Sequence, residues 1–299
     1  MSGYPRLAVA IALTLCCIGP VTSAEDRLAD VLTQARHAIG IDTPQTNLTS
    51  LSVDATVRRV LNAGAIDLSS QVHLDFILPD KYRRSEAVSM GPVSRTVTLG
   101  LAGEELLYED GGVASMMGAD PRAPGPRRVQ AIANLKLEAF RQLTVWFLSP
   151  PADAACTLSY AGIAEAPDGK ADVIDVKGGQ GRNVRLFIDT TSHQLLMATY
   201  DVESADPEQV KTLTERLMAR GGGDSDSAAT LAKSLSEELD KLPKKTVSVQ
   251  MHFSDYRRFG RLTLPARMVV DMADVQEDWT ISSFTLNPAL KAELFQNAR

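Results

Sequence analysis

Cysteine is scarce in this sequence, with three residues among 299. Cys16 and Cys17 lie in an apolar segment near the N-terminus, so Cys156 is the one cysteine that remains if this segment is cleaved off. A single cysteine has no intramolecular partner, which excludes a disulfide within the cleaved chain. Cys156 lies in a predicted strand, where it is most simply a small core residue.

Catalytic and cofactor-binding motifs are also lacking. Segment 178–181, Gly-Gly-Gln-Gly, is similar to a phosphate-binding loop, but a strand rather than a helix follows it. Segment 224–226 begins like a calcium loop, but Ala229 and Leu235 occupy the positions that require Gly and Glu. The sequence has no Gly-x-Ser-x-Gly nucleophile elbow, and its histidines are too far apart to form a short metal-ligand pair. We therefore predict a protein that is not an enzyme and binds neither cofactor nor metal.

Positive charge is not in excess. The sequence has 31 Lys and Arg residues against 37 Asp and Glu residues, which gives a formal net charge of −6. Sequence-independent binding of nucleic acid requires a basic surface, and electrostatic attachment to an anionic membrane requires a polybasic segment. We therefore expect no nucleic-acid partner.

The N-terminal segment has the parts of a secretion signal. Arg6 precedes an apolar run over 7–18, and small residues follow up to Ala24, just before acidic residues. The run is too short for a comfortable membrane span, and its flanks are those of a cleaved signal peptide. We predict that residues 1–24 are removed on export. Lipidation of Cys16 or Cys17 is the alternative, although Leu15 rather than a small residue precedes Cys16.

Two segments of the remaining chain show helical spacing of apolar residues. The first covers 25–39 and ends at Gly40; the second runs from Val129 to Phe147 and is stopped by two prolines. The second is the most apolar helix of the cleaved chain, which predicts that one of its faces is buried.

Most of the remaining sequence alternates between apolar and polar residues, which is typical of strands with one buried face. Ser70 is the one break in the longest alternating segment. The alternating segments are 51–57, 66–78, 81–90, 93–101, 104–108, 156–160, 171–176, 184–189, 195–202, 247–253, 262–272 and 279–286. Short turns between them favour antiparallel neighbours. We predict a mainly β (α+β) fold over 25–299: an incomplete antiparallel barrel of about ten strands, with helices covering one mouth.

Residues 203–245 interrupt this row of strands. Asp206-Pro207-Glu208 is a good helix start, and a glycine-rich link at 221–226 separates two leucine-bearing helical segments. We predict a helical hairpin inserted between two strands.

The order of these parts resembles the LolA/LolB-like family of outer-membrane lipoprotein carriers and its periplasmic relatives. The likeness is carried by the first helix with its two long strands, by 78–84 (Leu-Pro-Asp-Lys-Tyr-Arg-Arg), by 187–196, and by 253–260 together with 286–288 and Phe295. The resemblance implies a periplasmic protein of a Gram-negative-type bacterium. It also implies an incomplete barrel with a helical lid and an apolar interior.

The same resemblance directs attention to apolar residues of the second helix and the long strand. Candidate cavity-lining residues are Leu74, Phe76, Leu135, Phe140, Leu143, Trp146 and Phe147. The alternative is a helix packed on a sheet with no ligand, because apolar helix faces are usually core. Candidates at the cavity mouth are Arg83, Arg84, Met116 and Met117. The arginines point to opposite faces of a strand, and both are expected to be solvated unless one meets a lipid headgroup.

Two functions follow as hypotheses. In the first, the half-barrel shelters a lipid or a lipoprotein acyl chain in its apolar cavity. In the second, the barrel is a filled scaffold, and the leucine stripes of 203–245 dock a membrane or periplasmic protein partner.

Overall fold

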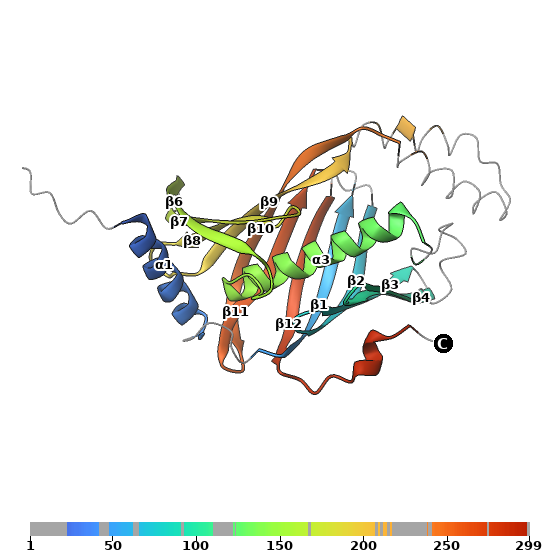
Figure 1. Ribbon diagram of the computed structural model, residues 1–299, viewed down its shortest axis with the longest axis horizontal. Helices are drawn as coiled ribbons and strands as arrows, with labels where there is room; N and C mark the ends of the chain where they lie inside the picture. Colours follow the sequence, from blue (N-terminus) through green and yellow to red (C-terminus); the bar gives the residue numbers. More distant parts are fainter. Residues whose placement is uncertain are drawn as a thin grey trace, which may run out of the picture.

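The computed structural model describes residues 23–41, 48–61, 66–90, 93–109, 122, 124–166, 169–206, 209, 212–213, 216, 238, 241–273 and 275–297. Within this part the chain forms one twelve-stranded sheet in the order β5-β4-β3-β2-β1-β12-β11-β10-β9-β8-β7-β6 (Figure 1). Neighbouring strands follow each other in sequence, except at the centre, where β1 pairs antiparallel with β12. The strands β5 and β6 are the two edges, so the sheet is not closed into a barrel.

Each alternating segment of the sequence corresponds to one strand, which makes twelve strands where about ten were predicted. The bounds are β1 (Ser50–Leu61), β2 (Ile66–Ile77), β3 (Lys81–Met90), β4 (Val93–Ala102), β5 (Glu105–Glu109), β6 (Cys156–Ala166), β7 (Gly169–Gly178), β8 (Asn183–Asp189), β9 (Leu195–Ala205), β10 (Lys244–Phe259), β11 (Leu262–Met272) and β12 (Val275–Leu286). All five residues of the short β5 pair with β4. Short alternating segments of this kind are therefore strands in their own right, which is why the sheet has more than ten strands. The predicted open half-barrel with helices is confirmed.

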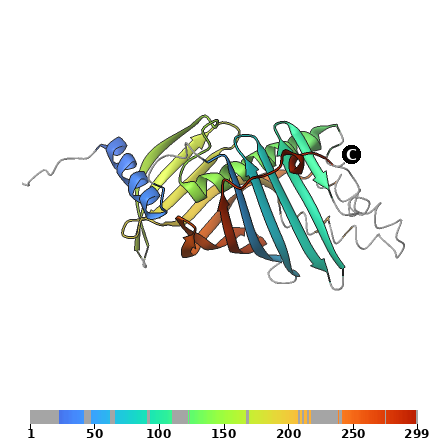
Figure 2. The same ribbon diagram turned by 90° about the horizontal axis from the view of Figure 1, so that it is seen from below.

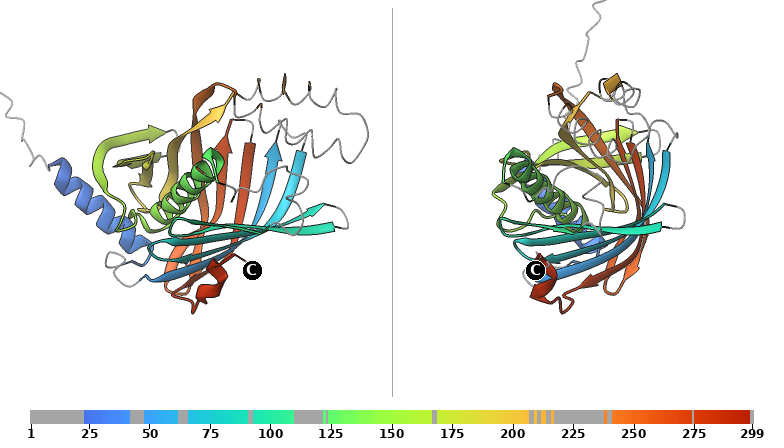
Figure 3. Two further views of the ribbon diagram at one scale, coloured as in Figure 1. Left: turned by 45° about the vertical axis from the view of Figure 1, so that its right-hand side comes forward. Right: turned by 90° about the vertical axis from the view of Figure 1, so that its right-hand side faces the viewer.

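The alternation of the sequence separates two faces of the sheet. In β1, for example, Leu51, Val53, Ala55 and Val57 are buried, while the residues between them are more exposed. The sheet curves, and its buried face surrounds one long helix (Figure 3). The core therefore lies between this helix and the inner face of the sheet.

The long helix is α3 (Pro126–Phe147), which begins with proline at its first position and ends at Leu148 in a left-handed conformation. The shorter α1 (Ala24–Ala38) begins at Ser23, whose side chain caps the helix. It packs against β6 at one edge of the sheet, where Arg27 forms an ion pair with Asp172 at 2.9 Å. A 3₁₀ helix, η2 (Ala292–Phe295), packs against β3 and β4 (Figure 2). No helix in the described part of the chain is long and apolar enough to cross a membrane.

Several predicted features lie outside the described residues. These are residues 1–22 of the predicted signal peptide, the two methionines Met116 and Met117, and most of the predicted hairpin. At the borders of that hairpin, β9 extends to Ala205 and β10 begins opposite it at Lys244. The strands therefore continue a little way into the predicted insertion from both sides.

Candidate functional site

The centre of the molecule is a column of five aromatic rings. Trp146 of α3 lies edge-on to Phe76 of β2 and Phe284 of β12, with ring centroids 6.2 and 5.1 Å away. Tyr82 of β3 packs on Phe76 at 4.8 Å, and Phe259 of β10 packs on Phe284 at 5.2 Å. This aromatic column joins α3 to both halves of the sheet, because β2 and β12 flank β1 on opposite sides.

All seven candidate cavity-lining residues are buried in the same core cluster. They are Leu74, Phe76, Leu135, Phe140, Leu143, Trp146 and Phe147. The aromatic column thus fills the space beneath the second half of α3 with side chains. That these residues line a ligand cavity stays a prediction.

A first cleft, of about 350 Å³, opens between α3 and the turns that join β2 to β3 and β4 to β5. Three candidate residues, Phe76, Phe140 and Leu143, form part of its wall. Its other apolar lining includes Leu78, Leu101 and Ala139, and its charged lining is Asp80, Lys81, Glu104, Lys136, Asp153 and Arg182. This volume lies within the usual range for small-molecule sites, about 300–1,000 Å³.

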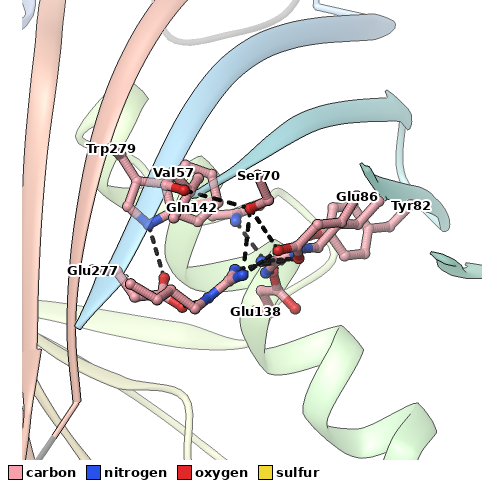
Figure 4. A network of polar contacts seen from close by, with 10 residues as sticks. Val57, Ser70, Tyr82, Glu86, Glu138, Gln142, Glu277 and Trp279 are labelled. Atoms are coloured by element: carbon pink, nitrogen blue, oxygen red, sulfur yellow. Dashed lines mark hydrogen bonds and ion pairs between the residues drawn. The ribbon is translucent and has the colours of Figure 1, made fainter. Parts of the chain in front are cut away.

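A charged network lies between α3 and the same inner face, toward the other end of the strands (Figure 4). Arg84 of β3 donates to Glu138 of α3 at 2.7 Å and to Glu86 at 3.0 Å. Arg59 of β1 pairs with Glu86 and, at 2.6 Å, with Glu277 of β12. The network therefore links the helix to four neighbouring strands, since Ser70 of β2 donates to Glu86 at 2.7 Å.

Neutral groups complete this charged network. Tyr82 donates to Glu138 at 2.8 Å, and Trp279 donates to Glu277 at 2.8 Å. Burial opposes ionisation of Glu86, but the hydrogen bond from Arg59 and the charge of Arg84 outweigh it and lower the pKa of Glu86. Burial and the Glu138 carboxylate both raise the pKa of Tyr82 well above its usual value. The carboxylate of Glu86 is therefore charged and the phenol of Tyr82 neutral at physiological pH.

The two mouth-candidate arginines lie on opposite faces, as predicted, but neither is fully solvated. The Arg84 side chain is 18% exposed and belongs to the charged network, while Arg83 contacts Asp75 at 3.4 Å on the outer face. The expectation that both are solvated is wrong, because the Arg83 side chain is only 20% exposed and the Arg84 side chain only 18%. Whether either meets a ligand stays a prediction.

The charged network was not predicted from the sequence, although one signal was present. Ser70 breaks the apolar alternation of β2, and it is buried against Glu86. Counting by two from Val57 and from Tyr82 places Arg59, Arg84 and Glu86 on the inner face. Polar residues at inner-face positions of three adjacent strands are the pattern that would have indicated a buried polar cluster.

A separate ionic cluster lies on the outer face. His73 contacts Asp54 through Nδ1 at 2.6 Å and Asp75 through Nε2 at 3.0 Å. A hydrogen bond with Asp75 is the main cause that raises the pKa of His73 to about 9, although partial burial opposes it. Because both ring nitrogens face carboxylates, both donate and the imidazole is charged.

We expect this cluster to make stability depend on alkaline pH. The His73 contribution is fully present below the unfolded pKa of 6.5 and is lost as pH rises through about 9. The side chain is 41% exposed, so solvent screening reduces the effect to about 1 kcal/mol. Denaturant unfolding at pH 6.5 and 9.5 should show this loss, and His73→Gln should remove it. An equal pH dependence in wild type and variant would contradict the prediction.

No group of three or more His, Cys, Asp or Glu side chains that could hold a metal occurs among the described residues. Cys156 is a free thiol that is only partly buried, and it packs against the core.

Comparison with known proteins gives likeness in structure alone. Neither the protein-family models nor the curated proteins give a match to this sequence. A LolA superfamily protein from Nitrosomonas europaea is similar with a TM-score of 0.48 at 9% identity, covering 90% of this chain and 97% of that one. A putative outer membrane lipoprotein-sorting protein domain from Vibrio parahaemolyticus gives 0.45 at 6% identity, covering 91% and 97%.

Proposed function

We propose that this is an exported, periplasmic binding protein that shelters the acyl chain of a lipid or lipoprotein in the first cleft. The observation that supports the proposal most directly is the apolar wall of that cleft, formed by Phe76, Leu101, Phe140 and Leu143. Each methylene of an acyl chain that leaves water for such a wall contributes about 0.8 kcal/mol. The signal-like N-terminal sequence and the lack of catalytic motifs favour the same function.

The lining of the first cleft also suits an amphipathic ligand. Lys81, Lys136 and Arg182 lie alongside the apolar wall, and Lys136 is paired with Glu104. A chain held against the wall would place its polar end near these side chains. The alternative function, docking of a protein partner by 203–245, stays a prediction because most of that segment lies outside the described residues.

Filling the first cleft should abolish acyl-chain binding. Ala139 lines the cleft, so Ala139→Trp places an indole where the chain would lie. We expect at least tenfold weaker binding of a fluorescent fatty-acid probe, because a ring of this size displaces several methylenes from the wall. Native mass spectrometry with lipid extraction on the protein purified from the periplasm should first show a bound lipid or acylated peptide.

The matched control is Ala133→Trp, the same substitution at an exposed position of the same helix. It should bind the probe like the wild type. If Ala139→Trp folds and still binds the probe like Ala133→Trp, the first cleft is not the site. If neither wild-type protein nor control takes up lipid, the acyl-chain function itself is wrong.

A further inference from the structure

The chain after β12 runs from the centre of the sheet to the edge strand β5 (Figure 2). At its start, the main-chain N–H of Thr49 donates to Asn287 Oδ1, and the N–H of Asn287 donates to the carbonyl of Ser50, both at 2.9 Å. Further on, η2 packs against β3 and β4, on the side of these strands opposite to α3 (Figure 3). We call residues 287–297 the C-terminal strap.

Two side chains hold the far end of the C-terminal strap. Phe295 is 2% exposed, although it lies outside the core cluster between α3 and the sheet. The Asn297 side chain accepts from the main-chain N–H of Tyr108 and donates to the carbonyl of Leu106, both at 3.2 Å. Asn297 thus bonds to the main chain of β5 at two positions, as a neighbouring strand would. Between the two ends of the strap, residues 288–294 are exposed or half-buried, so these two side chains carry the attachment.

The strands under the C-terminal strap also form a wall of the first cleft. Tyr82 of β3 and Leu101 of β4 line the cleft, and so do Gly103 and Glu104 in the turn that joins β4 to β5. In the described sheet, β5 is an edge strand of five residues whose one strand neighbour is β4. A short edge strand is where a fold opens locally at low cost. The strap therefore holds, from the outer face, the strand that borders this wall.

On the inner side, the same wall is joined to α3 by packing and by one ion pair. Both β4 and β5 pack against α3. Lys136 of α3 pairs with Glu104, and both residues line the first cleft. Their side chains are 36% and 80% exposed. An ion pair in solvent contributes little to stability, so this pair does not replace the C-terminal strap as a hold on the wall.

We propose that the C-terminal strap is a latch on the first cleft. While the strap is attached, the wall formed by β4 and β5 stays closed; when the far end of the strap is released, the wall opens and an acyl chain enters or leaves. This inference rests on the proposed acyl-chain function. None of the residues 287–297 is in the lining of the cleft, so the strap does not favour the bound state over the empty one. Its release therefore speeds entry and exit alike and leaves the affinity unchanged.

Rapid-mixing kinetics with the fluorescent fatty-acid probe test the latch on the full chain. The double variant Phe295→Ala with Asn297→Ala removes both attachments at the far end of the strap. We expect its association and dissociation rate constants to be at least tenfold higher than those of the wild type, with Kd within about threefold. The matched control changes the two exposed neighbours, Leu294→Ala with Gln296→Ala, and should keep the wild-type rates. Equal rates in all three proteins, or faster dissociation alone, would overturn the proposal.

A reporter thiol distinguishes failure of the latch from failure of the acyl-chain function. In a Cys156→Ala background, Leu101→Cys places a thiol in the cleft wall, where the native side chain is 3% exposed. The thiol reagent DTNB should label this cysteine at least tenfold faster once Asn297→Ala has removed the two hydrogen bonds to β5, whereas Gln296→Ala should leave the labelling rate unchanged. An unchanged rate with Asn297→Ala means that the latch is wrong, whether or not the protein binds lipid. Faster labelling in a protein that takes up no probe means that the strap does control the cleft and that the acyl chain is the wrong ligand.

Discussion

Replacing Trp146 with alanine is expected to lower the free energy of unfolding by about 3–5 kcal/mol, the usual cost of deleting a large buried aromatic side chain. Trp146 is 1% exposed and contacts rings from β2 and β12 at once. Removing the indole therefore leaves a cavity between α3, β2 and β12, and this cavity adds to the cost of the lost contacts. Denaturant unfolding of wild type and variant, followed by circular dichroism, measures the loss.

Trp146→Phe is the matched control, and it should cost far less. The indole Nε1–H of Trp146 is buried and has no acceptor within the described chain, so phenylalanine also removes an unsatisfied donor. An aromatic ring that keeps the contacts with Phe76 and Phe284 retains most of the packing. A loss for Trp146→Phe as large as that for Trp146→Ala would show that the indole nitrogen has a partner and that packing is not the main term.

The role of Trp146 also shows how far the sequence could be interpreted. Helical spacing from Val129 to Phe147 predicted the apolar face of α3, and this face is buried from Leu135 onward, whereas Val129 is 69% exposed. Spacing alone cannot distinguish a helix that lines a cavity from one that fills it, because both bury the same residues. The distinction depends on whether Phe76 and Phe284 approach the same indole from strands that are more than 200 residues apart in sequence.

The strands themselves were largely predictable, because a period of two follows directly from which face is buried. Short turns fixed their order within each half of the sheet. The central pairing of β1 with β12 was not predictable, since it joins residues as far apart in sequence as Leu51 and Leu286. Because β1 and β12 pair at the centre of the sheet, β5 and β6 are left as its two edges.

The charged network could not be predicted from local sequence patterns. Arg84 looked like a solvated residue after a turn, and its partner Glu138 lies in a helix 54 residues later. Nothing in either local sequence indicates the other residue. Polar residues at inner-face positions were the one available signal, and such departures from the pattern often occur at functional sites.

Replacing Arg84 with methionine should therefore have a large effect, a loss of about 3–5 kcal/mol in the free energy of unfolding. Methionine keeps much of the side-chain volume but removes the arginine that pairs with Glu138 and leaves Glu86 with Arg59 alone. Breaking a buried network on one side costs this much because a charge remains without compensation. Burial opposes the charge of Arg84, but the Coulombic attraction of Glu138 outweighs it and raises the pKa of Arg84. The direction of this pKa shift agrees with a charged arginine that stabilises the fold. Urea unfolding at neutral pH measures the loss.

The exposed pair of Arg58 with Asp67, at 2.6 Å, provides the matched control. Arg58→Met removes an arginine from the neighbouring strand position of Arg59 but on the outer, solvated face, and we expect stability to stay almost unchanged. If Arg58→Met and Arg84→Met destabilise the protein equally, the inner network behaves as a solvated surface pair and its assignment as buried is wrong.

The double variant Arg84→Met with Glu138→Met decides why the loss occurs. Suppose that Arg84→Met is costly because it leaves a carboxylate without a partner. In that case, removing Glu138 as well should recover part of the stability, since apolar side chains can replace a buried ion pair at little cost. The two substitutions would then be far from additive, as expected for groups in direct contact. Additive losses would mean instead that each side chain acts through its own packing. In that case α3 is held to the sheet by the aromatic column rather than by the charged network.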